Sequence, residues 1–252
     1  MSIIYSNNKN NPSYAWVSFA DSKYAKTLKR ISEEAKTIGL FDYMYTFNEK
    51  DLDPEFWNKH KDFIENNKRG YGYWIWKPYI IEMALLKIPE GCYLFHTDAG
   101  CVISANGASR ALEYIKLLNA TNKHILGFDM DYFESVWTKA DIFSYFNTSI
   151  ETYGKTRQII GGINIFRNSP ESREFIKKWR NIVENNYNLI DDSPSIKPNA
   201  EDFIENRHDQ SIFSMLMKIN SDITIAIPDE TYTTNWITFD SRIPFQARRL
   251  KY

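Results

Sequence analysis

Net charge and cysteine are what this sequence has least of. Its 252 residues carry 31 basic and 32 acidic side chains, for a formal net charge of -1. Such a balance gives no electrostatic attraction to nucleic acid or to an anionic membrane, so neither is expected as a main partner. The two cysteines, Cys92 and Cys101, lack the spacing of a metal-binding cluster. Free thiols favour a cytoplasmic protein.

Long hydrophobic runs are missing as well. No apolar stretch approaches the roughly 20 residues that a membrane-spanning helix needs. The N-terminal MSIIYSNNKNNPS also lacks the apolar centre of a signal peptide. The sequence therefore predicts no transmembrane segment. Repeats and linkers are absent too, which favours a single domain over residues 1–252, with residues 1–13 as a loose N-terminal arm.

Aromatic side chains, by contrast, are abundant. They make up 15% of the sequence, within a hydrophobic content of 43% that is normal for a globular core. Many of the rings lie beside polar residues, as in grooves that bind flat or sugar-like ligands. Core packing nevertheless explains most aromatic residues in most proteins.

Strands and helices are expected to alternate along the chain. Residues 14–19 have the pattern of a strand and precede a helix that ends at Gly39. Residues 42–47 predict a second strand, and a helix should open near Pro54. This alternation predicts an α/β fold with a mainly parallel central sheet and flanking helices. Asp21 or Ser22, just after the first strand, is a natural helix N-cap.

The segment Gly91 to Val102, GCYLFHTDAGCV, is predicted to be a buried strand that delivers Asp98 to the surface. Ligands bind at the carboxyl ends of the strands in open α/β sheets, so Asp98 stands where chemistry is usually done. The same residue can instead serve only to cap the turn that Ala99 and Gly100 form. The segment by itself favours neither interpretation.

Residues 68–78, KRGYGYWIWKP, combine two glycines, two tyrosines, two tryptophans and three cations. They are predicted to form a short loop before a buried helix that Pro78 opens. A cation at a helix N-terminus opposes the helix dipole, so Lys77 requires a compensating anion. A phosphate is the favoured anion because helix N-termini bind phosphate, and a carboxylate such as Asp98 is the alternative.

Two further segments carry candidate residues. Lys139 and Asp141 lie two apart and cannot share a helical face, so a helix should begin between them if both are functional. A solvated charged helix face is the alternative. Residues 159–166 predict a strand interrupted by Gly161 and Gly162. Paired glycines are typical of a bulge or of a ligand that approaches the backbone closely.

The C-terminal half adds a loop and a helix. Residues 186–200 are polar, contain two prolines and predict a mobile loop. A helix is then expected to open at Arg207, which places Asp209 and Gln210 in its first turn. An acid is favourable at that position even without a function.

Three segments together resemble a glycosyltransferase of the GT-A fold. In chain order they are R-G-Y-G-Y-W-x-W-K-P, D-A-G and R-H-D-Q-S, and the resemblance covers roughly residues 14–220. The set is similar to small glycosyltransferases of bacterial polysaccharide clusters and large DNA viruses. It implies a single Rossmann-like GT-A domain that moves a sugar from a nucleotide-sugar donor, by default a UDP-hexose, to a glycan hydroxyl in polysaccharide biosynthesis.

The resemblance also implies which residues form the site. Asp209 and Gln210 would be catalytic. Asp209 would be either the base that activates the acceptor in an inverting reaction or a holder of donor hydroxyls in a retaining one. The residues that would bind the nucleotide sugar are Ala20, Asp21, Tyr24, Arg69, Lys77, Asp98, Ala99, Lys139, Asp141, Gly161 and Gly162.

The implied metal site departs from the family pattern. Gly100 stands in place of the second acid of the D-x-D motif, and His96, on the same strand face as Asp98, is the candidate second ligand. A buried core histidine is the opposite interpretation. The resemblance implies Mn²⁺ or Mg²⁺ bound by Asp98 and His96. Metal-independent transfer, with charge supplied by Lys77, Lys139 and the C-terminal arginines, stays open.

The competing functional class is a non-catalytic carbohydrate-binding protein that kept the fold and lost the metal site. The broken acidic motif favours it, and the aromatic segment from Tyr71 to Trp76 would be its sugar platform. A phosphate-transferring or hydrolytic enzyme is least favoured, because the sequence has neither a Gly-rich phosphate loop nor a paired metal cluster.

Overall fold

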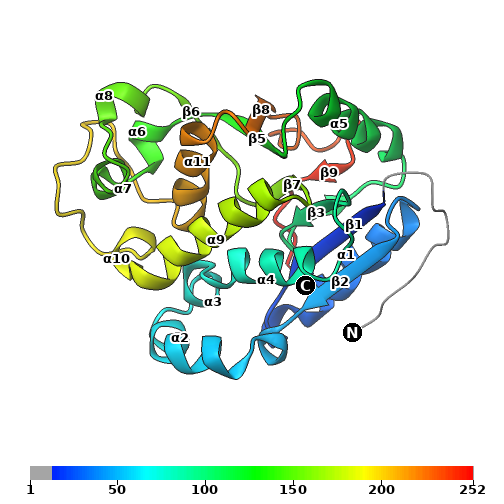
Figure 1. Cartoon of the computed structure of the whole chain (residues 1–252), viewed down its shortest axis with the longest axis horizontal. Coiled ribbons are helices and arrows are strands. Elements are labelled where there is room, and N and C mark those ends of the chain that lie inside the picture. Colours follow the sequence, from blue (N-terminus) through cyan, green and yellow to red (C-terminus); the bar gives the residue numbers. More distant parts are fainter. Residues whose placement is uncertain (1–12, 252) are drawn as a thin grey trace.

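A twisted sheet covered by helices forms the centre of the molecule (Figure 1). The computed structural model describes residues 13–251, so the predicted N-terminal arm lies outside the described residues apart from Ser13. Among these residues, every helix is too short or too polar to cross a bilayer.

The central sheet is mainly parallel, as predicted. Its strands lie in the order β2-β1-β3-β7-β5. Strand β6 pairs with β5 on the same side as β7, and β8 pairs with the opposite side of β5. Only β6 and β7 run antiparallel to their neighbours. A small second sheet pairs β4 with β9. The strands are β1 (Tyr14–Phe19), β2 (Tyr43–Phe47), β3 (Tyr93–Thr97), β4 (Val102–Ile103), β5 (Ile125–Phe133), β6 (Arg157–Ile159), β7 (Ile163–Arg167), β8 (Thr224–Pro228) and β9 (Phe245–Gln246).

The longer helices begin where the sequence supplies caps. Asp53 caps α2 with Pro54 in the first turn, and Ser169 does the same for the helix that opens at Pro170. The helices are α1 (Ala25–Thr37), α2 (Pro54–Asn66), α3 (Gly70–Tyr73), α4 (Trp76–Leu85), α5 (Ala108–Ala120), α6 (Glu134–Trp137), α7 (Ala140–Tyr145), α8 (Ile150–Tyr153), α9 (Pro170–Asn185), α10 (Tyr187–Ile190) and α11 (Asp209–Ile219), with 3-10 turns η1 (Ser22–Tyr24) and η2 (Glu49–Asp51).

Two hydrophobic clusters cover the two faces of the sheet. Side chains alternate along a strand, so Val17 and Leu94 enter the cluster that includes α2, α4, α9 and α11. Trp16 and Phe95 point the other way, into the cluster that includes α1 and α5. Strand β3 is buried on both faces, which confirms the expected central strand.

The aromatic segment before α4 is not a simple loop. Gly70–Tyr73 form the short helix α3, in which Tyr71 and Gly72 adopt left-handed φ values of 56° and 82°. A Cβ on Gly72 would lie 2.7 Å from Cγ1 of Ile64, so only glycine fits there. Helix α4 then begins at Trp76 rather than at Pro78. The prediction of the helix start was wrong by two residues because proline is tolerated throughout the first helical turn.

Candidate functional site

Lys77 is the centre of the candidate site. Helix α4 carries it into the protein, where it is only 2% exposed. Its Nζ lies 2.8 Å from Oδ2 of Asp209 and 3.2 Å from Oδ1 of Asp98, and it donates a hydrogen bond to the carbonyl of Gly161 at 3.3 Å. The structure thus joins the starts of α4 and α11, the end of β3 and the bend between β6 and β7.

The anion that the sequence requires for Lys77 is supplied by the protein itself. Burial acts to lower the pKa of the Lys77 ammonium, but Asp209 and Asp98 outweigh it and hold that pKa above its usual range. Lys77 therefore stays charged. Carboxylates of the protein are thus the anions beside Lys77, and a bound phosphate at this position remains a proposal.

The glycine bend lets the chain approach Asp98 closely. The backbone N–H of Asp98 donates to the carbonyl of Gly162 at 2.8 Å. A Cβ on Gly162 would lie 2.8 Å from Oδ2 of Asp98, closer than any side chain can come. The paired glycines therefore mark a close approach, as expected, and the group that approaches is the Asp98 carboxylate.

Gln210 is fixed by the same bend. Its Oε1 accepts a hydrogen bond from the backbone N–H of Gly161 at 3.0 Å, and its Nε2 donates to Oε1 of Gln158 at 2.7 Å. A Cβ on Gly161 would lie 3.0 Å from Cβ of Gln210. Gln210 therefore has a fixed orientation before any ligand binds.

Asp209 lies in the first turn of α11, as predicted, but the helix begins at Asp209 and not at Arg207. The preceding His208 has a left-handed φ of 57°, which turns the chain sharply into the helix. Burial raises the pKa of the Asp209 carboxyl from 3.8 to about 6, although Lys77 acts in the opposite direction. Asp209 is thus poised to change its protonation state just below neutral pH.

The residues around Asp98 do not fit a divalent ion. His96 is buried, with Nδ1 at 3.2 Å from Oδ1 of Asn164 and Nε2 at 3.7 Å from Oδ1 of Asp98. Burial lowers the pKa of His96 to about 4, so it is neutral near pH 7. Residues 13–251 nevertheless contain no group of three His, Cys, Asp or Glu side chains arranged to hold a metal. The Lys77 ammonium lies 3.2 Å from Oδ1 of Asp98, so a cation of the protein already occupies one of the two oxygens of that carboxylate.

Two solved structures with a similar architecture are glycosyltransferases. One is a glycosyltransferase involved in the glycosylation of the major capsid of PBCV-1, with a TM-score of 0.53 and 13% identity over 93% of this chain and 94% of that one. Another is the galactosyltransferase LgtC in complex with donor and acceptor sugar analogs, with a TM-score of 0.50 and 10% identity over 92% of this chain and 86% of that one. The fold is that of the GT-A glycosyltransferases.

Sequence comparison adds little to this likeness. No family model matches the chain. A curated protein, the chloroplastic NAD(P)H-quinone oxidoreductase subunit 4L of Cycas taitungensis, is 34% identical over 104 residues, which are 40% of this chain and 100% of that protein. The central sheet runs from Tyr14 to Pro228, so that match describes a segment, whereas the GT-A fold involves the whole sheet.

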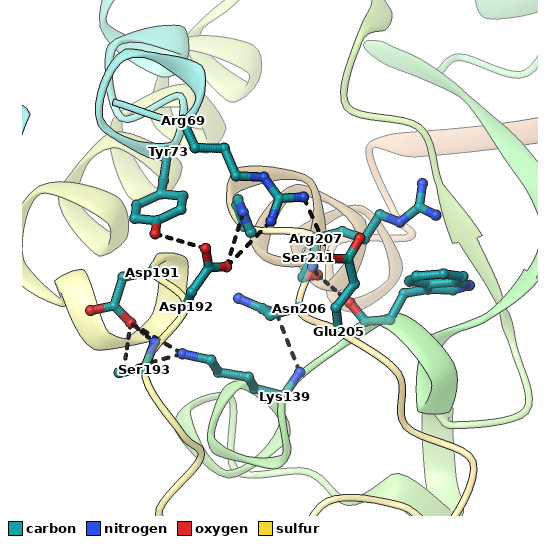
Figure 2. Close-up of polar contacts among 12 residues, drawn as sticks. Arg69, Tyr73, Lys139, Asp191, Asp192, Ser193, Glu205, Asn206, Arg207 and Ser211 are labelled. Carbon is teal, nitrogen blue, oxygen red and sulfur yellow. Dashed lines mark hydrogen bonds and ion pairs between the residues drawn. The ribbon is translucent and has the colours of Figure 1, made fainter. Parts of the chain in front are cut away.

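Lys139 and Asp141 form hydrogen bonds with the loop at residues 186–200. Lys139 Nζ donates to Oδ1 of Asp191 at 3.2 Å and to Oγ of Ser193 at 3.3 Å (Figure 2). Asp141 accepts the backbone N–H groups of residues 196 and 197 at 2.7 and 2.8 Å. Helix α7 begins between Lys139 and Asp141, as expected. The structure does not bring either residue into contact with Lys77, and the short helix α10 replaces the start of the predicted loop.

Ala20 and Asp21 lie at the end of β1 and line a cavity of about 480 Å³ between α1 and β2. Asp21 caps η1 by accepting the N–H of Tyr24 at 3.3 Å, which confirms the capping interpretation. The cavity does not include Asp98. Because β1 and β3 are parallel neighbours, the cavity and Asp98 nevertheless share the carboxyl edge of the sheet.

Arg69 reaches from α3 to the loop that precedes α11. It forms ion pairs of 3.5 Å with both Asp192 and Glu205 (Figure 2). Asp192 also accepts the hydroxyl of Tyr73 at 2.8 Å and lies 3.4 Å from Nε2 of His208. Asp192 was not predicted from the sequence, because only the folded chain brings the loop that carries it to α3.

The C-terminal segment explains why Gly100 replaces an acid. The backbone N–H of Leu250 donates to the carbonyl of Gly100 at 2.8 Å. A Cβ on Gly100 would lie 3.2 Å from Cα of Arg249, so a larger residue would push this segment away. The basic C-terminus is evident in the sequence, but its position over the Asp98 turn is a finding of the structure.

Proposed function

We propose that the protein is a glycosyltransferase that moves a sugar from a nucleotide-sugar donor, by default a UDP-hexose, to a glycan hydroxyl. The observation that carries the proposal is the buried Lys77 ammonium held between Asp98 and Asp209 at the carboxyl edge of the sheet. Titratable groups with strongly perturbed pKa values cluster at functional sites, and ligands of open α/β sheets bind at this edge. The GT-A fold supports the same class of reaction.

Each residue of the cluster has a task in this proposal. Asp98, the most exposed of the three, would hold the donor ribose or diphosphate, and Lys77 would balance the phosphate charge. On transfer, the acceptor oxygen bonds to the anomeric carbon of the sugar. The bond from that carbon to the diphosphate breaks, and the diphosphate leaves with the electron pair. In an inverting reaction the acceptor proton goes to Asp209.

Two roles for Asp209 follow from its surroundings. A carboxyl with a pKa of about 6 is suited to act as a general base near neutral pH. Its burial beside Lys77 equally suits a fixed acceptor for donor hydroxyls, with Gln210 facing the positive charge that develops on the sugar. The anomeric configuration of the product separates the two roles, because a base gives inversion and a sugar holder belongs to retention.

Calorimetry with UDP, GDP, CMP and TDP, followed by turnover assays with the corresponding sugar nucleotides, tests the proposal. We expect one nucleotide to bind at micromolar to low millimolar concentration and its sugar donor to be hydrolysed or transferred. Failure of all four nucleotides to bind at millimolar concentration would overturn the glycosyltransferase assignment.

The carbohydrate-binding alternative loses support in the structure. Tyr73 and Trp76 of its sugar platform are 7% and 5% exposed, and Trp76 stacks on Phe19 with ring centroids 4.0 Å apart. Most of the aromatic segment therefore packs into the core, which leaves little ring surface for a glycan. Glycan binding without any nucleotide binding would favour this alternative.

A further inference from the structure

Arg207 carries a charge that the protein does not neutralise. The guanidinium carbon lies 3.9 Å from the centre of the Trp137 ring and 5.7 Å from that of Tyr132. Its buried Nε has no hydrogen-bond partner among the described residues. Within residues 13–251 no carboxylate lies within 4.0 Å of it. Arg207 lies two residues before Asp209, in the segment that leads from the loop into α11.

Arg249 brings a second cation to the same place from the end of the chain. Its Cα lies against Gly100, and Leu250 fixes the segment there through the hydrogen bond to the Gly100 carbonyl. Arg249 adopts a left-handed φ of 56° and is exposed. In the described part of the chain it forms no ion pair, so its guanidinium group is available to a ligand over the Asp98 turn.

Arg69 completes the cluster from the side of α3. Burial lowers the pKa of the Arg207 guanidinium, and the like charges of Arg249 and Arg69 lower it further. Arg249 and Arg69 each lie near enough to Arg207 for their charges to act on it. Figure 2 shows Arg69 and Arg207 near Glu205, and Arg69 forms ion pairs of 3.5 Å with Glu205 and Asp192. Arg207 and Arg249 form no ion pair within residues 13–251, so the group as a whole retains positive charge that fits an anionic ligand.

We propose that Arg69, Arg207 and Arg249 bind the diphosphate of the donor and take over the role of a divalent ion. The proposal rests on the proposed function and extends it to a metal-independent reaction. Guanidinium groups bind phosphate oxygens in pairs through their planar fork of N–H donors. When the bond to the anomeric carbon breaks, the diphosphate gains a negative charge, and the arginines neutralise it without any change in oxidation state.

The arrangement also accounts for Gly100, where the family pattern has an acid. A Cβ on Gly100 would lie 3.2 Å from Cα of Arg249, so the segment that carries Arg249 leaves little space for a side chain. The glycine removes a potential metal ligand, and the same segment brings a cation to the Asp98 turn. Lys77, a further cation, lies between Asp98 and Asp209.

Inorganic pyrophosphate is the probe for this site. Its affinity is measured by calorimetry for the wild-type protein and for Arg207→Gln and Arg249→Gln, with EDTA and with Mn²⁺. We expect binding in EDTA that Mn²⁺ changes by less than about threefold and that each substitution weakens by about 10- to 100-fold, since hydrogen bonds to charged groups are lost. Arg242→Gln is the matched control, because Arg242 is exposed, pairs only with Asp240 and should leave the affinity unchanged.

Arg207→Lys is the control that separates a loss of binding from a loss of folding. It keeps the charge over Trp137 and loses the planar fork, so we expect an unchanged melting temperature and an intermediate affinity. Pyrophosphate binding that requires Mn²⁺, or that survives the Arg207 and Arg249 substitutions at wild-type strength, would overturn the proposal.

The two proposals can fail separately. Sugar transfer that continues at full donor affinity in Arg207→Gln and Arg249→Gln leaves the glycosyltransferase assignment standing and removes the arginine site. Pyrophosphate binding that depends on both arginines, in a protein that turns over none of the sugar nucleotides, keeps the anion site and removes the donor assignment.

Discussion

At the scale of single residues, the Lys77 ammonium and its two carboxylates decide the character of the site. A buried charge is costly unless it is paired, and removing one partner of a buried pair typically costs about 3–5 kcal/mol. Lys77 satisfies this requirement with Asp209 at 2.8 Å and Asp98 at 3.2 Å. Stability and ligand binding are therefore linked in the same three side chains, and their substitutions need matched controls.

Substitution of Lys77 by methionine tests its charge-balancing role. Lys77→Met should lower the melting temperature and weaken nucleotide diphosphate binding at least tenfold, because two carboxylates lose their cation. Lys218→Met is the control, since Lys218 pairs with buried Glu134 at 2.5 Å and does not contact Lys77. We expect Lys218→Met to destabilise the protein similarly and to leave calorimetric affinity for the nucleotide unchanged. Equal affinities for both variants would separate Lys77 from donor binding.

The pH dependence of turnover reports on Asp209. With a pKa of about 6 beside Lys77 and Asp98, an acid that must be ionised should lose activity as the pH falls below about 6. Asp209→Asn should lower turnover by on the order of a hundredfold or more and abolish this acidic limb. An active Asp209→Asn protein with an unchanged pH profile would return the residue to a purely structural role.

Stability should respond to pH with the opposite sign. The folded protein holds the Asp209 proton more tightly than the unfolded chain, whose pKa is near 3.8. The free energy of unfolding of the wild type should therefore decrease as the pH rises from about 4 to about 6. Asp209→Asn should lack this decrease. Melting temperatures of both proteins across that range measure the difference.

At the scale of elements, the bend between β6 and β7 brings the backbone to the site. Gly162→Ala would place a Cβ 2.8 Å from Oδ2 of Asp98 and should displace that carboxylate. We expect a loss of about 1–3 kcal/mol in stability and at least a tenfold loss of donor affinity. Gly127→Ala is the matched control, because its Cβ would clash with Ile159 in the core and not with Asp98. Retained donor affinity in Gly162→Ala would contradict the role of the bend.

The loop at residues 186–200 is the second element with a predicted function. Lys139 and Asp141 hold it from α7, and Arg69 holds Asp192 within it. We expect it to be mobile in the free enzyme and to close over the donor, which would exclude water from the reacting sugar. Diphosphate binding by Arg69 would alter its contact with Asp192 and so couple the loop to the ligand.

Hydrogen exchange with and without the donor nucleotide measures this closure. Slower exchange of the loop amides in the complex is the expected result. Asp141→Asn should speed exchange at residues 196 and 197 in the free protein, because it weakens the acceptor of their N–H groups. Identical protection of the loop in both states would remove it from the mechanism.

At the scale of the whole molecule, the site is formed by segments that are far apart in the sequence. Arg69 and Arg249, which are far apart in the sequence, both lie near enough to Arg207 to act on its charge, and the backbone of Arg249 packs against Gly100 just after β3. The small sheet of β4 and β9 ties the C-terminal segment to the Asp98 turn, with Ile103 opposite Phe245. This turn lies at the edge of the mainly parallel sheet where its parallel strands end.

Local features of the sequence determined much of the fold. The strand at residues 14–19, the α2 start at Pro54 with its Asp53 cap, and the position of Asp98 directly after a strand buried on both faces all agree with the structure. These features depend on periodicity and on caps, which involve neighbours within a few residues. The resemblance of three short motifs then indicated the GT-A fold.

Only the tertiary structure decided which residues meet. Lys77 and Asp209 are far apart in the sequence, and no local pattern states that their charges pair. Lys139 and Asp141 do not join this cluster, because the fold places them against the loop at residues 186–200 and not against Lys77. Gly100 shows the same principle, because the reason for its missing side chain is the backbone of Arg249. Contacts between distant segments depend on how the whole chain packs. The spacing of residues within a short segment carries no information about that packing.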